Sequence, residues 1–207
     1  MTVLLHPGYF PNVAHFVAML QSDVIVFEAF DNYQKQTYRN RSTVFGANGS
    51  LDLNVPVVYS QNNRQLYKDV EIFNADNWQQ QHLKSLESAY RTSPFFEYYI
   101  DDFMPLFTKS YTHIMALNLD CLKVVFDCLQ VPFQYSLTST FELEPEGVLD
   151  ARPLINCRKE IRQDFKVYAQ VFDDKHQFLH NLSILDLLFN EGPASEIYLQ
   201  AQTLQLP

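Results

Sequence analysis

The N-terminal residues 1–27 predict a unit of strand, helix and parallel strand, which constrains the fold more than any other feature. Residues 2–5 form a short apolar run that ends at His6-Pro7-Gly8. Asn12 is a good N-cap for a helix over residues 13–21, where apolar side chains recur at helical spacing. The β-branched run at residues 23–27 is typical of a buried parallel strand. Such a unit is right-handed, and ligands bind at the carboxyl ends of its strands.

The middle of the chain changes from strand-like to helical patterns. Residues 42–75 combine turns with short alternating or apolar runs, which predict strands. From residue 75 onward, apolar side chains recur at helical spacing. Ser93-Pro94 predicts a second helix, because Ser is a good N-cap and Pro is accepted at the first helical position. A third helix is predicted from about Thr112 to Gln130.

The C-terminal part predicts strands and one further helix. Strands are expected at residues 134–142 and 165–172. Ser183-Ile184-Leu185-Asp186 has the form of a capping box ahead of an apolar helix. Gly192-Pro193 predicts the end of that helix, because Gly at C′ followed by Pro cannot continue it.

We therefore expect a single α/β domain over residues 1–207. It consists of a Rossmann-like N-terminal βαβ core at residues 1–75, a helical middle section at 76–132 and a C-terminal β/α segment at 133–207. The length fits one large domain. No repeat, low-complexity stretch or linker divides the sequence.

The scarcity of glycine excludes two common phosphate-binding motifs. The chain has only five glycines among 207 residues, and no two are adjacent. A dinucleotide fingerprint needs a G-x-G-x-x-G pattern, and a P-loop needs a Gly-rich turn that ends in Gly-Lys-Ser/Thr. An anion site in this chain must therefore be built from side chains rather than from a Gly-rich loop.

Charge and cysteine content narrow the class of partner. A net charge of −9 argues against nucleic acid and against an anionic membrane surface. Three cysteines without paired spacing suit reduced thiols, and no basic leader or apolar run of about 18 residues is present. We expect a cytoplasmic protein with no membrane span and no metal site. The cofactor and the oligomeric state, a homo-oligomer included, are left open.

Several separate motifs carry a resemblance to a known family. They are His6-Pro7-Gly8-Tyr9-Phe10-Pro11, Asp31-Asn32-Tyr33-Gln34-Lys35 with Tyr38-Arg39-Asn40-Arg41, and Ile184-Leu185-Asp186-Leu187-Leu188-Phe189-Asn190 with Gly192-Pro193. In this order they resemble the WbqC-like protein family, over about residues 3–199. The family usually opens with Gln-Pro-x-Tyr-Phe-Pro, so that His6 stands where Gln is usual, and Tyr38 stands where Trp is usual.

The resemblance implies a place in bacterial surface-polysaccharide synthesis. Members of the family resemble proteins encoded in gene clusters for O-antigen and other surface polysaccharides. Transfer chemistry on activated sugars is the activity that this context favours. Whether the chain is an enzyme is left open, and a transferase is favoured.

Lys35, Arg39 and Arg41 concentrate positive charge in a loop after the second strand of an acidic chain. Two arginines separated by one residue can bind phosphate or carboxylate oxygens in bidentate fashion, and Asn40 can bind a hydroxyl or amide. We predict an anion clamp for a small molecule such as a nucleotide, an activated sugar or an acyl donor. The alternative is surface pairing with Asp and Glu. Three tyrosines near this loop could stack on a base or sugar ring: Tyr9, Tyr33 and Tyr38.

His6, His15 and Asp31 are the candidate catalytic groups. His6 follows the first strand, His15 lies in the first helical turn, and Asp31 follows the second strand, close to the cations. The two histidines loosely resemble those of class I nucleotidylyltransferases, although the His-x-Gly-His element is missing. The alternatives are structural: a backbone contact for His6, partial exposure for His15 and an Arg partner for Asp31.

His82 and Asn190 complete the candidate substrate contacts. His82 lies one turn after Trp78 on the same helical face, and Asn190 precedes the Gly192-Pro193 stop. A core position and helix termination are the respective alternatives.

Three hypotheses for the function follow from these residues. The first is a transferase-type enzyme of surface-polysaccharide or related glycan biosynthesis, which binds an anionic donor through the Lys/Arg loop. The second is a non-catalytic ligand-binding or assembly protein of the same pathway, and the third is a nucleotidyltransferase-like enzyme. A cleft shared by His6, Asp31, Arg39 and Arg41 would favour the first.

Overall fold

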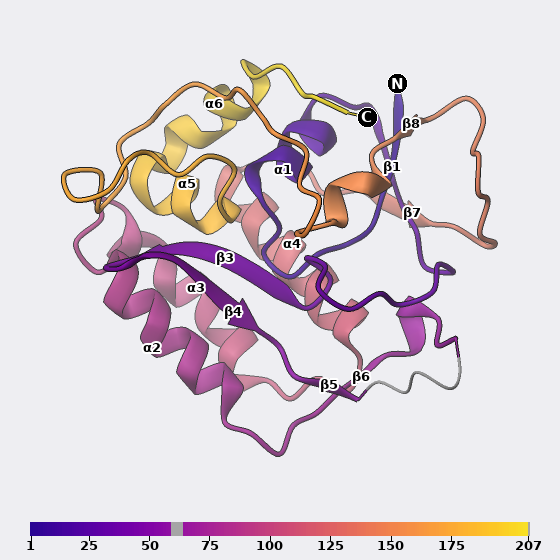
Figure 1. Ribbon diagram of the computed structural model, residues 1–207, viewed down its shortest axis with the longest axis horizontal. Coiled ribbons are helices and arrows are strands. Elements are labelled where there is room, and N and C mark those ends of the chain that lie inside the picture. The colour runs from indigo at the N-terminus through magenta and orange to yellow at the C-terminus, as the bar shows by residue number, and fades with distance from the viewer. Residues whose placement is uncertain (59–63, 207) are drawn as a thin grey trace.

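A four-stranded parallel sheet lies toward one side of the computed structural model, which describes residues 1–58 and 64–206 (Figure 1). The strand order is β7-β2-β1-β8. The central strands β1 (Thr2–Leu5) and β2 (Val24–Phe27) pair in parallel, and β7 (Tyr135–Leu137) and β8 (Leu149–Asp150) are the edges. The predicted α/β class is confirmed, whereas the Rossmann-like description stays a prediction.

The predicted strand–helix–strand unit is present, with α1 (Val13–Leu20) between β1 and β2. Asn12 caps this helix as expected, because its side chain accepts a hydrogen bond from the His15 backbone N–H at 3.3 Å. The carboxyl ends of all four strands therefore meet at one edge of the sheet, which is where α/β proteins bind ligands.

Aromatic packing joins one face of the sheet to the helices. Phe16 of α1 contacts Phe126 of α4 (Ile114–Leu129), and the Phe126 ring stacks on Phe133 with 4.5 Å between centroids. Phe133 in turn contacts Phe27 of β2. This chain of rings explains part of the high aromatic content. On the opposite face, the loop of residues 138–148 and the sheet enclose a cavity of about 290 Å³.

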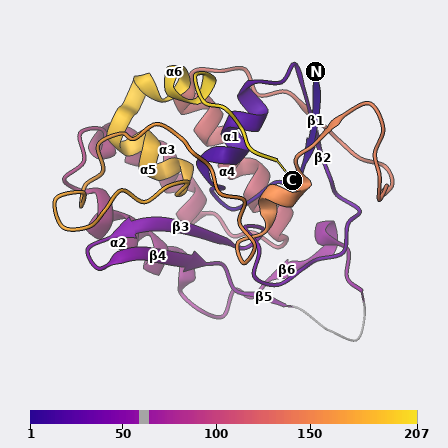
Figure 2. The ribbon, with the colours of Figure 1, turned by 45° about the horizontal axis from the view of Figure 1, so that its top comes forward.

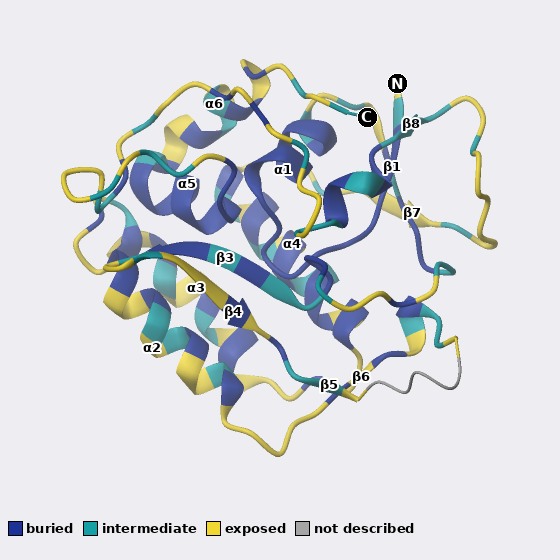
Figure 3. Cartoon of the chain, in the orientation of Figure 1, coloured by how far each residue is buried: buried dark blue, intermediate teal, exposed yellow. Residues whose placement is uncertain are grey.

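Most of the remaining elements lie to one side of the sheet (Figures 1 and 2). A hairpin crosses the molecule, and its first strand lies between α2 and α5 in both views (Figures 1 and 2). Burial is most continuous in α1 and α5, whereas α2 and α3 keep an exposed face (Figure 3). The elements are β3 (Arg41–Gly46), β4 (Gly49–Asn54), β5 (Val57–Val58), η1 (Tyr67–Asp69), β6 (Glu71–Ile72), α2 (Trp78–Tyr90), α3 (Phe96–Thr108), η2 (Arg152–Ile155), α5 (Ile184–Glu191), η3 (Gly192–Ala194) and α6 (Ser195–Gln200).

Two local predictions were wrong. The helix expected to begin at Ser93-Pro94 begins at Phe96, because the Ser93 hydroxyl donates to the Tyr90 carbonyl and closes the preceding helix instead. Residues 165–172 alternate as a strand would, but they form no strand in the described chain. The alternation has a different cause. Tyr168 and Gln170 point inward because both donate to the buried carboxylate of Asp186.

Candidate functional site

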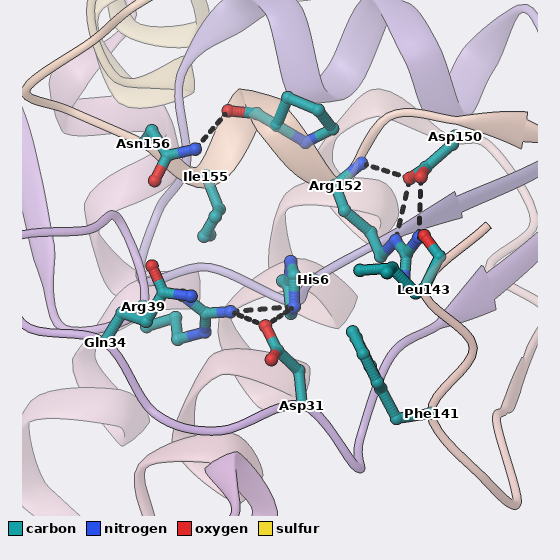
Figure 4. A pocket seen from close by; sticks show the side chains of 11 residues that line it. His6, Asp31, Gln34, Arg39, Phe141, Leu143, Asp150, Arg152, Ile155 and Asn156 are labelled. Carbon is teal, nitrogen blue, oxygen red and sulfur yellow. Dashed lines mark hydrogen bonds and ion pairs between the residues drawn. The ribbon is translucent and has the colours of Figure 1, made fainter.

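A cavity of about 240 Å³ lies at the carboxyl ends of the parallel strands (Figure 4). His6 follows β1 and Asp31 lies beyond the end of β2, while β8 ends at Asp150. We call it the strand-end cavity. Its lining is His6, Asp31, Gln34, Arg39, Phe141, Leu143, Asp150, Arg152, Pro153, Ile155 and Asn156. The position agrees with the expectation for a βαβ unit.

Asp31, His6 and Arg39 meet at a single carboxylate oxygen. Arg39 Nη2 donates to Asp31 Oδ2 at 2.6 Å and lies 2.7 Å from His6 Nε2. His6 Nε2 lies 2.9 Å from the same Oδ2. A neutral imidazole can use this nitrogen to donate to Asp31 or to accept from Arg39, but not both. The group is therefore a hydrogen-bonded cluster in which Asp31 is held by one of its two oxygens.

Buried side chains fix Arg39 from behind. The guanidinium lies over the Tyr67 ring, 5.3 Å from its centroid. Asn118 of α4 donates to the Arg39 carbonyl at 2.7 Å and to the Tyr67 hydroxyl at 2.6 Å. Because Tyr67 also donates to the Pro7 carbonyl, the loop after β1 and the Arg39 loop are fastened to the same two side chains.

The protonation states follow from burial and charge. Burial, with the nearby Arg39 charge, lowers the pKa of His6 to about 4, so this histidine is neutral near pH 7. Burial raises the pKa of Asp31, but the hydrogen bond with His6 and the Arg39 charge outweigh it, and the pKa of Asp31 is lowered. The cavity thus contains an ionised carboxylate beside a neutral imidazole.

Arg152 forms a second fixed pair on the other side of His6 (Figure 4). Its Nε and Nη2 donate to the two oxygens of Asp150 at 2.8 and 2.6 Å, which is the bidentate geometry that Arg and carboxylate favour. The same guanidinium donates to the carbonyls of Glu142 and Leu143 in the loop of residues 138–148. It also lies 5.3 Å from the centroid of the Phe141 ring.

The charges at this cavity balance. Arg39 pairs with Asp31 and Arg152 pairs with Asp150, while His6 is neutral. Most N–H groups of Arg152 are committed to Asp150 and to two loop carbonyls, so the lining offers carboxylates and a few remaining N–H groups to a ligand and no large excess of positive charge. This arrangement suits a small polar ligand better than a highly charged one.

The model of the WbqC-like protein family matches residues 6–165, which is most of the chain and includes every residue that lines the strand-end cavity. This chain belongs to the WbqC-like protein family. No curated protein and no solved structure matches it. The match begins at His6 and ends before the last helix motif, so the strand-end cavity lies within the part that defines the family.

Of the residues predicted for the site, this WbqC-like chain brings His6, Asp31 and Arg39 together in the strand-end cavity. Arg41 and Tyr38 line a second cavity of about 360 Å³. The two predicted clamp arginines are thus separated, because Arg41 is the first residue of β3 and pairs with Asn54. The single anion clamp formed by both arginines is not seen.

The other predicted residues line neither of these two cavities. His15 is buried, and its Nδ1 lies 2.7 Å from Asn12 Oδ1. His82 Nδ1 lies 2.9 Å from the Tyr9 hydroxyl in the core, where burial lowers the pKa of His82 to about 4. Asn190 donates to the Asp186 carbonyl within α5, and Asn40 donates to the Val55 carbonyl. Tyr33 and Lys35, the two remaining candidates, likewise line neither cavity.

Three residues that line the strand-end cavity were not predicted from the sequence: Asp150, Arg152 and Phe141. The Asp150-x-Arg152 spacing after an apolar pair was the available signal, since one residue between the two allows the arginine to fold back onto the aspartate. The two-residue strand β8 that places them is too short to predict from pattern.

Residues 1–58 and 64–206 contain no group of three or more His, Cys, Asp or Glu side chains suited to a metal ion. None of the helices in this part of the chain is long and apolar enough to span a bilayer.

Proposed function

We propose that this WbqC-like protein is a transferase-type enzyme of bacterial surface-polysaccharide or related glycan biosynthesis, with the strand-end cavity as its active site. One observation carries the proposal. Asp31 is an ionised carboxylate whose Oδ2 is held by His6 and Arg39, and its side chain, 13% exposed, lines the cavity. Because Asp31 stays ionised it can accept a proton from a substrate, and its lowered pKa makes it a weak base that acts while the new bond is forming.

The proposed step is transfer of a group from an activated donor to a hydroxyl or amino group of an acceptor. Asp31 takes the proton from the acceptor, whose oxygen or nitrogen forms the new bond to the transferred group. The bond between that group and the donor's leaving group breaks, and the electron pair leaves with the donor's phosphate or carrier. Arg39 keeps Asp31 ionised and positioned before the acceptor binds, and it lowers the proton affinity of Asp31 at the same time.

Arg152 and Arg39, on opposite sides of His6, are proposed to bind the donor (Figure 4). Arg39 is thus kept from the expected Lys/Arg loop, and Arg152 takes the place expected for Arg41. Because both guanidinium groups already pair with aspartates, the donor is expected to present a carboxylate or a single phosphate near them rather than a triphosphate.

A non-catalytic ligand-binding protein of the same pathway is the second candidate. The balanced charges of Arg39, Asp31, Arg152 and Asp150 favour it, because such a neutral polar lining can hold a hydroxylated ligand without any chemistry. The nucleotidyltransferase alternative has less support, since His15 is buried and lines neither cavity.

The test combines ligand binding with turnover. Thermal-shift screening with nucleotide sugars, sugar phosphates and acyl carriers identifies a donor, and mass spectrometry then follows the donor incubated with hydroxylated and amino acceptors. Asp31→Asn leaves Arg39 without its anion and is expected to lower the Tm of the free protein, so turnover is measured on the folded fraction. There it is expected to fall by roughly 10²–10⁴-fold while the donor still raises the Tm. Asp127→Asn, which removes an exposed carboxylate on α4, is the matched control. Equal turnover in Asp31→Asn contradicts catalysis by Asp31, and a bound donor recovered unchanged favours the second candidate.

A further inference from the structure

Three buried hydrogen-bond donors converge on one carboxylate oxygen in the second cavity. Glu160 Oε1 accepts from Asn181 Nδ2 at 2.7 Å, from Asn12 Nδ2 at 3.0 Å and from the Tyr38 hydroxyl at 3.0 Å. The three donor residues are only 2% (Asn12), 4% (Tyr38) and 9% (Asn181) exposed. Glu160 itself is an exposed residue in a segment, residues 156–164, that forms no helix or strand.

The donors are held in place without any help from Glu160. Asn12 Oδ1 caps α1 and contacts His15, so the Nδ2 group of Asn12 is turned toward Glu160. Asn181 Oδ1 accepts from the Ala14 backbone N–H at 2.8 Å, which turns its Nδ2 group the same way. The Tyr38 backbone N–H donates to the Ile155 carbonyl at 2.8 Å. A set of donors fixed from behind is the arrangement that stabilises an oxyanion.

Positive groups also lie around this point, beside the carboxylates of Asp52 and Glu160. Two of the donors stand at the N-terminus of the eight-residue helix α1, whose positive end lies there. Arg41 and Arg158 line the same cavity, and Arg41 Nε is buried without a hydrogen-bond partner. The opposing carboxylate of Asp52 lies 3.7 Å from Arg41 Nη1, a distance too long for a close pair.

We propose that Asn12, Tyr38 and Asn181 form a binding site for the carboxylate or phosphate group of a small molecule, and that Glu160 occupies this site as an internal ligand in the free protein. An incoming oxyanion displaces the Glu160 side chain and gains Arg41 and Arg158 as further contacts. Partial burial raises the pKa of the Glu160 carboxyl, and the hydrogen bonds from the three donors oppose that rise.

This site is separate from the strand-end cavity. Tyr38 and Arg41 face the second cavity, whereas Arg39 faces the first. The extended contact between Tyr38 and Ile155, with the neighbouring bridge from Thr37 to Asn156, lies between the two. The inference therefore goes beyond the proposed function, and neither depends on the other.

The test measures binding of inorganic phosphate and of acetate to the full chain. Nuclear magnetic resonance titrations at constant ionic strength follow the side-chain amide signals of Asn12 and Asn181. Glu160→Ala is expected to bind the better of the two anions at least about tenfold more tightly than the unmodified protein, since the internal competitor is gone. Adding Tyr38→Phe to this variant is expected to weaken binding by about tenfold, the value of one hydrogen bond to a charged group.

Matched variants separate this site from general charge effects. Glu144→Ala removes one negative charge from the exposed loop of residues 138–148 and is expected to leave anion binding unchanged. Glu160→Gln keeps the shape of the side chain without its charge and is expected to give an intermediate affinity. This variant replaces Glu160→Ala in the test if Glu160→Ala folds poorly. Stronger binding of acetate identifies a carboxylate ligand, and stronger binding of phosphate a phosphorylated one. Equal affinity in Glu160→Ala and Glu144→Ala, or loss of binding on Arg152→Lys instead of Tyr38→Phe, overturns the proposal.

Discussion

The Arg39 guanidinium lies 2.6 Å from the carboxylate of Asp31, and Arg39 is 1% exposed although it lies outside any helix or strand. A charge that has lost its water must be compensated by a partner at short range. Asp31 provides that compensation and lines the strand-end cavity at the same time. The pair therefore links the stability of the loop to the integrity of the candidate site.

Arg39→Met is expected to lower the free energy of unfolding by about 3–5 kcal/mol, because it leaves the Asp31 carboxylate largely desolvated without its cation. Urea unfolding at pH 7 measures this value. Lys123→Met on α4 is the control: it breaks an exposed i, i+4 pair with Asp127 and is expected to change the free energy by less than about 0.5 kcal/mol. Similar losses in the two variants would show that the Arg39 pair contributes no more than a surface pair.

Asp186 gives a pH prediction of definite sign. Burial raises the pKa of this carboxyl from its usual 3.8 to about 6, although Tyr168, Tyr90 and Gln170 donate to it. The folded state thus binds the proton more tightly than the unfolded state. The resulting stability is complete below pH 3.8 and is lost as the pH rises through about 6.

Relative to Asp186→Asn, the unmodified protein is therefore expected to lose about 2–3 kcal/mol of unfolding free energy as the pH rises across this window. The tyrosine hydroxyls can rotate to accept from the new amide, so the variant keeps its contacts. Urea unfolding of both proteins at a series of pH values measures the difference between their unfolding free energies. Other titrating groups contribute equally to both proteins, so their contributions cancel in this difference. A constant difference across the window would contradict a raised pKa.

The N-terminal core was predictable because local pattern and topology agree there. An apolar run, a capped helix and a β-branched run can form one parallel unit, and the ends of its strands must then lie together. His6 and Asp31 could be placed at one edge for this reason, and the structure has them 2.9 Å apart. Arg39 could be placed in the same loop, but its burial against Tyr67 depends on contacts far along the chain.

Non-local contacts decided what the sequence could not show. Strand β8 is two residues long and exists because Val3 and Leu4 pair with it, so Asp150 and Arg152 could not be assigned to the site from pattern. Arg39 and Arg41 diverge because β3 begins at Arg41 and pairs with β4. The apparent strand at residues 165–172 has its polar side chains bound to Asp186, which alternation alone does not reveal.

Gly192 is expected to be intolerant of any side chain. Its φ is +53°, and a Cβ atom there would lie 2.6 Å from the Phe95 ring. Gly192→Ala should therefore lower the unfolding free energy by about 2–4 kcal/mol, from backbone strain and overpacking together. Gly49→Ala is the comparison, since Gly49 has φ +105° with nothing within 4 Å of its Cβ position. Denaturant unfolding of both variants should give the larger loss for Gly192→Ala, and equal losses would exclude the clash with Phe95.

Arg152 is expected to hold the loop of residues 138–148 in place. Its guanidinium donates to the carbonyls of Glu142 and Leu143 while its other nitrogens bind Asp150, a fork that a single ammonium group cannot reproduce. Arg152→Lys should therefore increase amide hydrogen exchange in this loop by about tenfold or more, with little change in α5. Hydrogen exchange followed by mass spectrometry measures both regions. Arg162→Lys, in an exposed pair with Asp164, should leave the loop unchanged. Unaltered exchange in Arg152→Lys would mean that other contacts hold the loop.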